Sequence, residues 1–418
     1  MSKPGSGYLK CVALATGMKC LPASKLSQAN GVALHDWHAE VLAIRAFNRL
    51  VLDECRRLAQ DSTTQSEFLR RRTDAELSSP SSGDGSWHAQ PFAWREDLTL
   101  HMYCSEAPCG DASMELIIST QEDATPWAIP ASLAPSPSPS HAPAPAPAPA
   151  LSSESTPPSE GGVALLGRGF FSHLGIVRRK PARGDAPPTA SKSCSDKLAL
   201  KQCTSLLSSL TSLFVSPRRA YLSTLVLPAS QFSETGCRRC FSGGDGGEGS
   251  EGEAEIEGAK GEGRDDGKVG GQATATMERM RPVAGRTWGG TGYAFVPFRV
   301  EITALEFEFS RRAIVGGGSG NEKQIKVTAS NLAVAWARDG AVQEGLIGGV
   351  LQGRRGFDIR GASLTSRRKM WESAVKIAAA LGNERGELLG ARRKVKDEVR
   401  TKALKGWLRN TGDGEFGL

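Results

Sequence analysis

Two short motifs place residues that can bind a metal and move protons at the starts of predicted helices. His38 and Glu40 precede a stretch with apolar residues at helical spacing, and Cys109 opens a second predicted helix about 70 residues later. Imidazole and thiolate are ligands that Zn²⁺ prefers, and a helix N-terminus stabilises the thiolate. Glu40 stands two residues past His38, so it need not ligate the same ion and can reach a metal-bound water instead.

The two motifs alone do not identify a third metal ligand. H-x-E followed by P-C-x-x-C is typical of zinc deaminases, but Ala112 stands where the second cysteine is expected. Three protein ligands plus water are the norm for catalytic zinc. Cys194, which also precedes a predicted helix, is the better substitute, and Cys104, within the strand before the turn, is the weaker one. We interpret the isolated pair Cys237 and Cys240 as the end of a helix rather than a metal site.

The charge of the chain indicates a polyanionic partner. The net charge is +7, and an excess of six acids in 241–270 leaves +13 for the remainder. The segment 367–409 holds thirteen Lys/Arg against five Asp/Glu. Nucleic acid is the leading partner for such a basic chain, and an ordinary solvated helix surface is the alternative.

Composition argues against a membrane or secreted protein. The sequence has no run of 18 uncharged apolar residues, and its first residues lack the basic-then-apolar layout of a secretory signal. Nine cysteines at irregular spacing fit a reduced intracellular protein of the cytoplasm or nucleus better than a disulfide scaffold. Four of them are expected to be core fillers, namely Cys11, Cys20, Cys55 and Cys203.

Strands alternate with helices along the chain, which predicts one α/β domain over 8–410. Strands are predicted at 9–17, 98–104, 221–228, 294–303, 329–337 and 345–353. Helices are predicted to begin near Asp36 or His38 with Asp36 as a possible N-cap, near Ala112, over 193–214, and in two basic stretches that end at Trp407. The residues with chemical potential stand at the strand-to-helix turns.

Three segments interrupt this pattern. Residues 121–160 contain eleven of the 23 prolines, and 242–276 is rich in glycine and glutamate. Neither composition supports a hydrophobic core, so both are predicted to be disordered insertions. The polar stretch 61–90 is predicted to be a surface insertion.

Five segments together resemble one known family. They are LATGMKCL, LHDWHAEVLAIRAF, SEAPCGDASMEL, RRKPARGDAPPTASKSCSDKLALKQ and YLSTLVLP. They resemble the adenosine-deaminase domain shared by RNA-editing and tRNA adenosine deaminases, and the likeness runs from about Leu9 to Trp407. It implies a cytidine-deaminase-like three-layer α/β/α core with a mixed sheet, enlarged by a C-terminal α/β extension. It also implies that SCSDK supplies the third zinc ligand, Cys194.

The resemblance also implies a reaction and a substrate class. Only a few residues stand before Tyr8, so we expect no double-stranded-RNA-binding module ahead of the domain and favour the tRNA branch. That branch implies hydrolytic deamination of adenosine 37 of alanine tRNA to inosine, with no membrane or DNA partner. The same chemistry on another RNA such as mRNA, and a non-catalytic RNA-binding relative, are the alternatives. Lys19 is expected to contact an RNA phosphate, or else to be a solvated strand end.

The family implies inositol hexakisphosphate buried in the core, since buried Lys and Arg need a counter-charge. Arg45 and Lys197 are the matching positions, and looser matches are Lys201, Lys369, Lys396, Lys402 and Lys405. The alternative is that Lys197 pairs with Asp36 or Asp196 while Arg45 reaches solvent. The chain departs from the family pattern at His35, where asparagine is common, at Ile44, where arginine occurs, and in lacking a helix before the first strand.

Overall fold

The structure is a computed structural model. It describes residues 1, 8–78, 89–119, 165–166, 173–180, 187–244, 278–316, 330–382, 387–414 and 416. The predicted insertion at 121–160 lies outside the described residues. So does the insertion at 242–276, apart from its first residues, 242–244.

An antiparallel sheet forms one half of the molecule. Its strands run in the order β1 (Ala13–Thr16), β11 (Leu332–Ala337), β12 (Val342–Ile347) and β13 (Val350–Leu351). The alternate alanines of β11 are fully buried, and their small side chains allow the long helix α1 (Ala39–Gln60) to pack closely on that face. The strand predicted to be buried at 9–17 is only half-buried on the face with Ala13 and Ala15, and Leu14 on the other face is 48% exposed.

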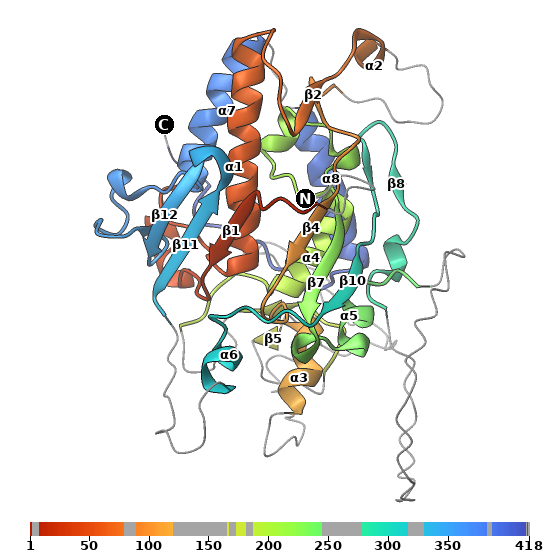
Figure 1. Ribbon diagram of the computed structural model, residues 1–418, viewed down its shortest axis with the longest axis vertical. Helices are drawn as coiled ribbons and strands as arrows, with labels where there is room; N and C mark the ends of the chain where they lie inside the picture. The colour runs from red at the N-terminus through yellow and green to blue at the C-terminus, as the bar shows by residue number, and fades with distance from the viewer. Residues whose placement is uncertain are drawn as a thin grey trace, which may run out of the picture.

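A parallel sheet forms the other half. Its order is β10 (Arg299–Thr303), β7 (Leu222–Pro228) and β4 (Leu100–Tyr103). The carboxyl ends of these strands meet at one edge, the lower edge in Figure 1. Three small pairs complete the described strands: β2 (Leu69–Arg71) with β3 (Phe92–Trp94), β5 (Leu165–Leu166) with β6 (Arg178–Arg179), and β8 (Thr287–Trp288) with β9 (Tyr293–Ala294).

The α/β class is therefore confirmed, but the described strands make separate sheets of uniform direction instead of one mixed sheet. The reason is that β11, β12 and β13 follow one another through tight antiparallel turns and pair only with each other and with β1.

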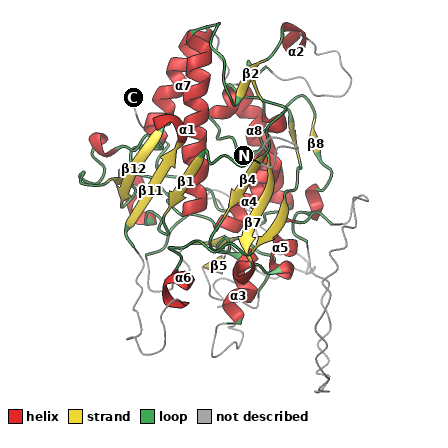
Figure 2. Cartoon of the chain, viewed as in Figure 1, coloured by secondary structure: helices red, strands yellow, loops and turns green. Residues whose placement is uncertain are grey.

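Helices pack against both halves (Figure 2). Helix α1 lies against α7 (Arg367–Leu381), and α4 (Cys194–Thr204) lies against α8 (Glu387–Lys402). The short helices are α2 (Asp74–Ser78), α3 (Met114–Ile118), α5 (Glu234–Phe241) and α6 (Arg311–Gly316). The helix predicted over 193–214 ends at Thr204, because Ser205 takes a left-handed backbone φ of 56°.

Two further expectations change in the described residues. The segment 61–78 is not only surface, since Phe68 and Leu69 are buried and Phe68 stacks on Trp94 with ring centroids 6.2 Å apart. Of the four expected core cysteines, Cys55 and Cys203 are buried, Cys20 is half-buried and Cys11 is exposed. Of the helices within the described ranges, none combines the length and apolarity needed to cross a bilayer.

Candidate metal centre and adjoining basic cavity

Three side chains from distant segments converge at the starts of two helices. His38 is the residue before α1, Cys109 follows β4, and Cys194 is the first residue of α4. Their ligand atoms all lie within 4.8 Å of one another. Cys109 Sγ is 3.9 Å from His38 Nδ1 and accepts a hydrogen bond from the Cys194 backbone N–H at 3.3 Å. The structure thus brings together the three residues predicted to bind zinc, whereas Cys104 belongs to no such group among the described residues.

Local backbone interactions fix these positions. His38, and not Asp36, is the residue that caps α1, while the Asp36 carboxylate accepts the His38 backbone N–H at 3.0 Å. Ser193 caps α4 by accepting the Asp196 backbone N–H at 3.1 Å. Gly110 has φ of 108°, and a Cβ there would lie 2.2 Å from Ser193 Oγ. Only glycine therefore allows the Cys109 turn to approach the Cys194 turn so closely.

Buried ion pairs anchor the segment that follows each cysteine. Asp111, two residues after Cys109, binds Arg239 at 2.9 Å, and Asp196, two residues after Cys194, binds Arg279 at 2.6 Å. Both aspartates and both arginines are at most 5% exposed at the side chain. Arg239 also pairs with Glu115, whereas removing Asp196 or Arg279 leaves a buried charge without its ion-pair partner. The two arginines are joined in turn, because the Arg279 backbone N–H donates to the Arg239 carbonyl at 3.1 Å.

The isolated Cys237/Cys240 pair behaves as interpreted from the sequence. Both cysteines are buried in α5, the helix that carries Arg239. Cys240 Sγ donates to the Asp111 carboxylate at 3.4 Å. Within the described part of the chain neither cysteine joins a metal-capable group.

The donor set fits a zinc ion. The hydrogen bond with Cys194 and the charges of Lys180 and His38 hold the pKa of Cys109 well below its usual range. Burial and then the Cys109 charge raise the pKa of Cys194. Burial and Lys180 act to lower the pKa of His38, but Cys109 outweighs them and raises it to about 10. The pKa values of the two thiols and the imidazole are thus coupled through their hydrogen bonds and charges. Once a metal displaces their protons, the three groups can supply three tetrahedral ligands and leave a fourth position for water.

Glu40 lies beside the cysteines. It stands in the first turn of α1 and is half-buried. Its carboxylate charge contributes to the raised pKa of both Cys104 and Cys194. The carboxylate is thus near the ligand group without belonging to it, as the H-x-E spacing predicts.

Lys180 is the functional residue that the sequence reasoning missed. It is 3% exposed, and its ammonium donates to Asp36 Oδ2 at 2.8 Å and to Cys194 Sγ at 3.1 Å. Burial opposes its charge, but Asp36 and the cysteines raise its pKa well above the usual value. The sequence feature that could have pointed to it is the basic run Arg178-Arg179-Lys180, in which the first and third residues are buried and the middle one is half-buried.

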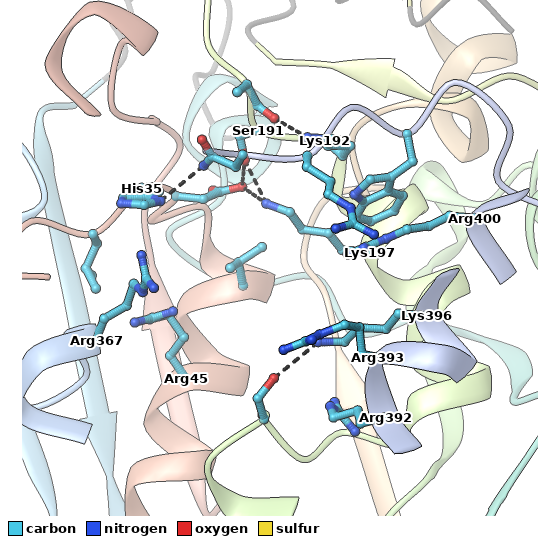
Figure 3. A pocket seen from close by; sticks show the side chains of 18 of the residues that line it. His35, Arg45, Ser191, Lys192, Lys197, Arg367, Arg392, Arg393, Lys396 and Arg400 are labelled. Atoms are coloured by element: carbon cyan, nitrogen blue, oxygen red, sulfur yellow. Dashed lines mark hydrogen bonds and ion pairs between the residues drawn. The ribbon is translucent and has the colours of Figure 1, made fainter. Parts of the chain in front are cut away.

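A basic cavity of about 580 Å³ lies on the other side of Asp36. Side chains from α1, the 190–197 segment, α7 and α8 point into it (Figure 3). Its lining includes nine Lys/Arg residues and two aspartates: Arg45, Lys192, Lys197, Arg367, Arg392, Arg393, Lys396, Arg400, Arg409, Asp36 and Asp397.

Of the predicted polyanion-binding residues, Arg45, Lys197 and Lys396 line this cavity. The other four predicted positions do not, for local reasons. Lys201 donates to the Leu206 and Leu207 carbonyls, Lys369 pairs with Glu372, Lys402 pairs with Glu398, and Lys405 lies exposed past the end of α8. The α8 residues in their place are Arg392, Lys396 and Arg400, which recur every fourth residue on one helix face.

The cavity cations lack sufficient counter-charge. Burial, and then Arg392 and Arg400, lower the pKa of Lys396 well below its usual value. Burial, with Lys197 and Arg400 next, lowers the pKa of Lys192 to about 7. Burial and Arg367 lower the pKa of Arg45 to about 10, against the opposing effect of Asp36. A polyanion would remove these penalties, so the lining fits a ligand with several phosphates.

A continuous set of hydrogen bonds joins the cavity to the metal group. Lys197 donates to Asp36, Asp36 accepts from Lys180, and Lys180 donates to Cys194 Sγ. The alternative pairing of Lys197 with Asp36 therefore occurs, yet Lys197 also lines the cavity. Arg45 does not simply reach solvent, because it donates twice to the Thr365 carbonyl at 2.7–2.9 Å.

Lys19 lies near the start of α1. Its carbonyl accepts the Trp37 backbone N–H at 3.1 Å, and its ammonium donates to the Asn331 side chain. Lys19 is half-buried and lies outside both the metal group and the lining of the basic cavity.

Comparison with known proteins agrees with this geometry. Residues 13–243 match the adenosine-deaminase (editase) domain. A tRNA-specific adenosine deaminase 1 from Schizosaccharomyces pombe is 30% identical over 410 residues, which is 96% of this chain and 83% of the relative. The Saccharomyces cerevisiae protein of that name is 30% identical over 225 residues, 54% of this chain and 47% of the relative. A double-stranded RNA-specific editase from Drosophila melanogaster is 27% identical over 116 residues, 28% of this chain and 15% of the relative. The chain therefore belongs to the adenosine-deaminase (editase) domain family and is a hydrolytic deaminase.

Proposed function

We propose that the protein deaminates adenosine to inosine in tRNA with the help of zinc, and that its target is adenosine 37 of alanine tRNA. The observation that carries this proposal is the convergence of His38, Cys109 and Cys194 beside Glu40. The relative that aligns with nearly the whole chain is named as a tRNA-specific enzyme, which supports tRNA as substrate. The excess of basic residues fits a nucleic-acid partner.

The chemistry follows from the residues around the metal group. Zinc, when bound, supplies a water of lowered pKa as the nucleophile for C6 of the adenine. Glu40 accepts the proton of that water and passes it to the ring nitrogen. The C–N bond to the amino group then breaks, and ammonia leaves with the second proton. Cys194 is buried, while His38 and Cys109 are half-buried, so the ligand group is only partly shielded from bulk water.

We also propose inositol hexakisphosphate as a second cofactor, and the observation that supports this proposal is the basic lining of the cavity. Arg45, Lys197 and Lys396 would contact it, together with lining residues such as Arg400. Six phosphates would neutralise the nine cations of the lining and accept bidentate Arg contacts. We further infer that the two sheets and their helices belong to one cytidine-deaminase-like three-layer core. The nine free cysteines favour a reducing compartment, the cytoplasm or the nucleus.

A different RNA substrate is the second candidate, since part of the chain aligns with a double-stranded RNA-specific editase. The experiment is to incubate purified protein with a transcript of alanine tRNA and with an RNA duplex, and to sequence both for A-to-I change. We expect inosine at position 37 of the tRNA, none in a transcript with guanosine at that position, and none with Glu40→Ala. Inosine in the duplex alone would favour the second candidate, and inosine in neither RNA would refute both.

A further inference from the structure

Exposed aromatic residues follow β10. Phe309 is 70% exposed and Phe307 is 42% exposed, and their rings meet edge to face with centroids 5.7 Å apart. Leu305, two residues earlier, is 76% exposed. A contiguous group of large apolar side chains held in solvent costs free energy, so it marks a surface that binds something.

This aromatic loop, residues 305–312, is attached to the segment that leads to Cys109. Arg312 donates to the Ser105 carbonyl at 2.6 Å and pairs with Glu106 at 2.8 Å. Tyr103 at the end of β4 donates to the Leu305 carbonyl at 3.3 Å. In Figure 1 the chain crosses from β10 to α6 along the edge where the carboxyl ends of β4 and β7 lie. The loop is therefore fixed beside the segment that leads to Cys109.

The chemistry of the loop suits the face of a nucleobase better than a phosphate. Glu306 is already occupied, since it pairs with Arg312 and accepts from Ser230. Glu301 pairs with Arg299 at 3.5 Å, and Glu308 is exposed and would repel phosphate groups. Aromatic faces, by contrast, stack on any unpaired base, and this is the usual way proteins hold single-stranded RNA.

Deamination itself creates the need for such a surface. An adenosine must leave its stack to reach the ligand group, and its neighbours then lose a stacking partner. We propose that Phe309, supported by Phe307, stacks on a base that flanks the target adenosine. The proposal rests on the proposed function in tRNA. A protein partner on this loop would instead cover the approach to Cys109 and hinder the substrate.

The test measures binding and single-turnover deamination of an alanine tRNA transcript by four variants. Phe309→Leu keeps an apolar side chain without the ring, and Phe309→Trp keeps an aromatic face. Phe307→Ala removes the support, and Trp371→Ala is the matched control, because Trp371 is a 41% exposed aromatic on α7. Zinc content and melting temperature are recorded for each. A second transcript carries an abasic nucleotide next to the target.

We expect Phe309→Leu to raise the half-saturating tRNA concentration about tenfold, as for the loss of one base–aromatic stack. Its rate at saturation, zinc content and melting temperature should stay at wild-type values, and Phe309→Trp and Trp371→Ala should match wild type. Phe307→Ala should give a smaller increase of about threefold. With the abasic transcript the difference between Phe309→Leu and wild type should disappear.

Equal half-saturation for Phe309→Leu and wild type would overturn the proposal. So would a tenfold effect that persists on the abasic transcript, or a change in the oligomeric state of Phe309→Leu without a change in tRNA binding. Deamination by the wild-type protein reports the proposed function separately. A wild type that binds the transcript but produces no inosine contradicts that function, while the binding ratio of the variants still decides whether the loop stacks on a base.

Discussion

The metal group and the basic cavity lie on either side of Asp36, which lines the cavity and accepts the His38 backbone N–H, but they differ in how their function depends on single residues. The metal group has three ligands on three short motifs, and buried aspartate–arginine pairs fix the segments after its cysteines. The cavity spreads its charge over nine Lys/Arg residues, several of which come from one helix face. The function of the metal group therefore depends on each of its three ligands. The function of the cavity depends instead on the total positive charge of its lining.

Loss of a ligand should have the largest effect. Cys194→Ala removes one of only three protein ligands, so we expect the purified protein to lose most of its zinc and all measurable deamination. Cys104→Ala is the control, because Cys104 is a buried thiol near Glu40 but outside the ligand group. Metal analysis and single-turnover assays check both. Full zinc in Cys194→Ala together with zinc loss in Cys104→Ala would contradict the ligand assignment.

Loss of the proton carrier should come next. Glu40→Gln keeps the shape of the side chain but cannot accept a proton, so deamination should fall by a factor of about 10³. Zinc content and tRNA binding should be unchanged, because Glu40 lies outside the ligand group. Turnover near that of the wild type would show that another residue moves the protons.

Cavity variants should give graded losses. Lys396→Met removes one cation of the lining. Lys402→Met, six residues further along α8, removes a cation that pairs with Glu398 outside the lining. We expect phosphate analysis of denatured wild-type protein to show about six phosphates per chain, as for a hexakisphosphate. Lys396→Met should retain less, and Lys402→Met the wild-type amount. Protein made in cells without inositol polyphosphates should be insoluble or inactive. Active protein with no releasable phosphate would refute the cofactor.

The difference between short motifs and dispersed charge also explains which site residues can be predicted from the sequence. His38, Glu40 and Cys109 follow from type and spacing, because ligands at helix starts have few alternatives. Lys180 does not, since only its burial beside Cys194 distinguishes it from other basic residues.

The sequence predicts only in part which face of α8 lines the cavity. Arg392, Lys396 and Arg400 recur at helical spacing, but any of several faces of a basic helix could point inward. Packing of α8 against α4 selects this one.

The pH dependence of ligand retention should be a smaller effect, and it should come from Lys192. Burial and the neighbouring cations lower the pKa of Lys192 to about 7 because they disfavour its charge. A bound polyanion favours that charge and raises the pKa. The contribution of Lys192 to binding is thus fully present below about pH 7 and is lost as pH rises through the higher, bound-state value. Release of bound phosphate should be faster at alkaline than at neutral pH, and Lys192→Met should reduce the difference. An identical pH profile for Lys192→Met would contradict this assignment.

The smallest effect should come from the insertions, because the metal group and the cavity lining found among the described residues are already made up of other segments. The described residues on either side of 245–277 are already held together: the Arg279 backbone N–H donates to the Arg239 carbonyl at 3.1 Å, and Arg238 pairs with Glu278 at 2.9 Å. A short Gly/Ser linker in place of 248–272 can therefore close the chain without disturbing the buried arginines. We expect unchanged zinc, phosphate and deamination, and a melting temperature within a few degrees of the wild type. Deletion of 131–157 should behave in the same way.

Arg279→Met is the contrasting variant, since it leaves Asp196 buried without its partner and should lower both zinc retention and stability. A loss of zinc in the linker variant as large as that in Arg279→Met would show that 248–272 helps to position the metal group.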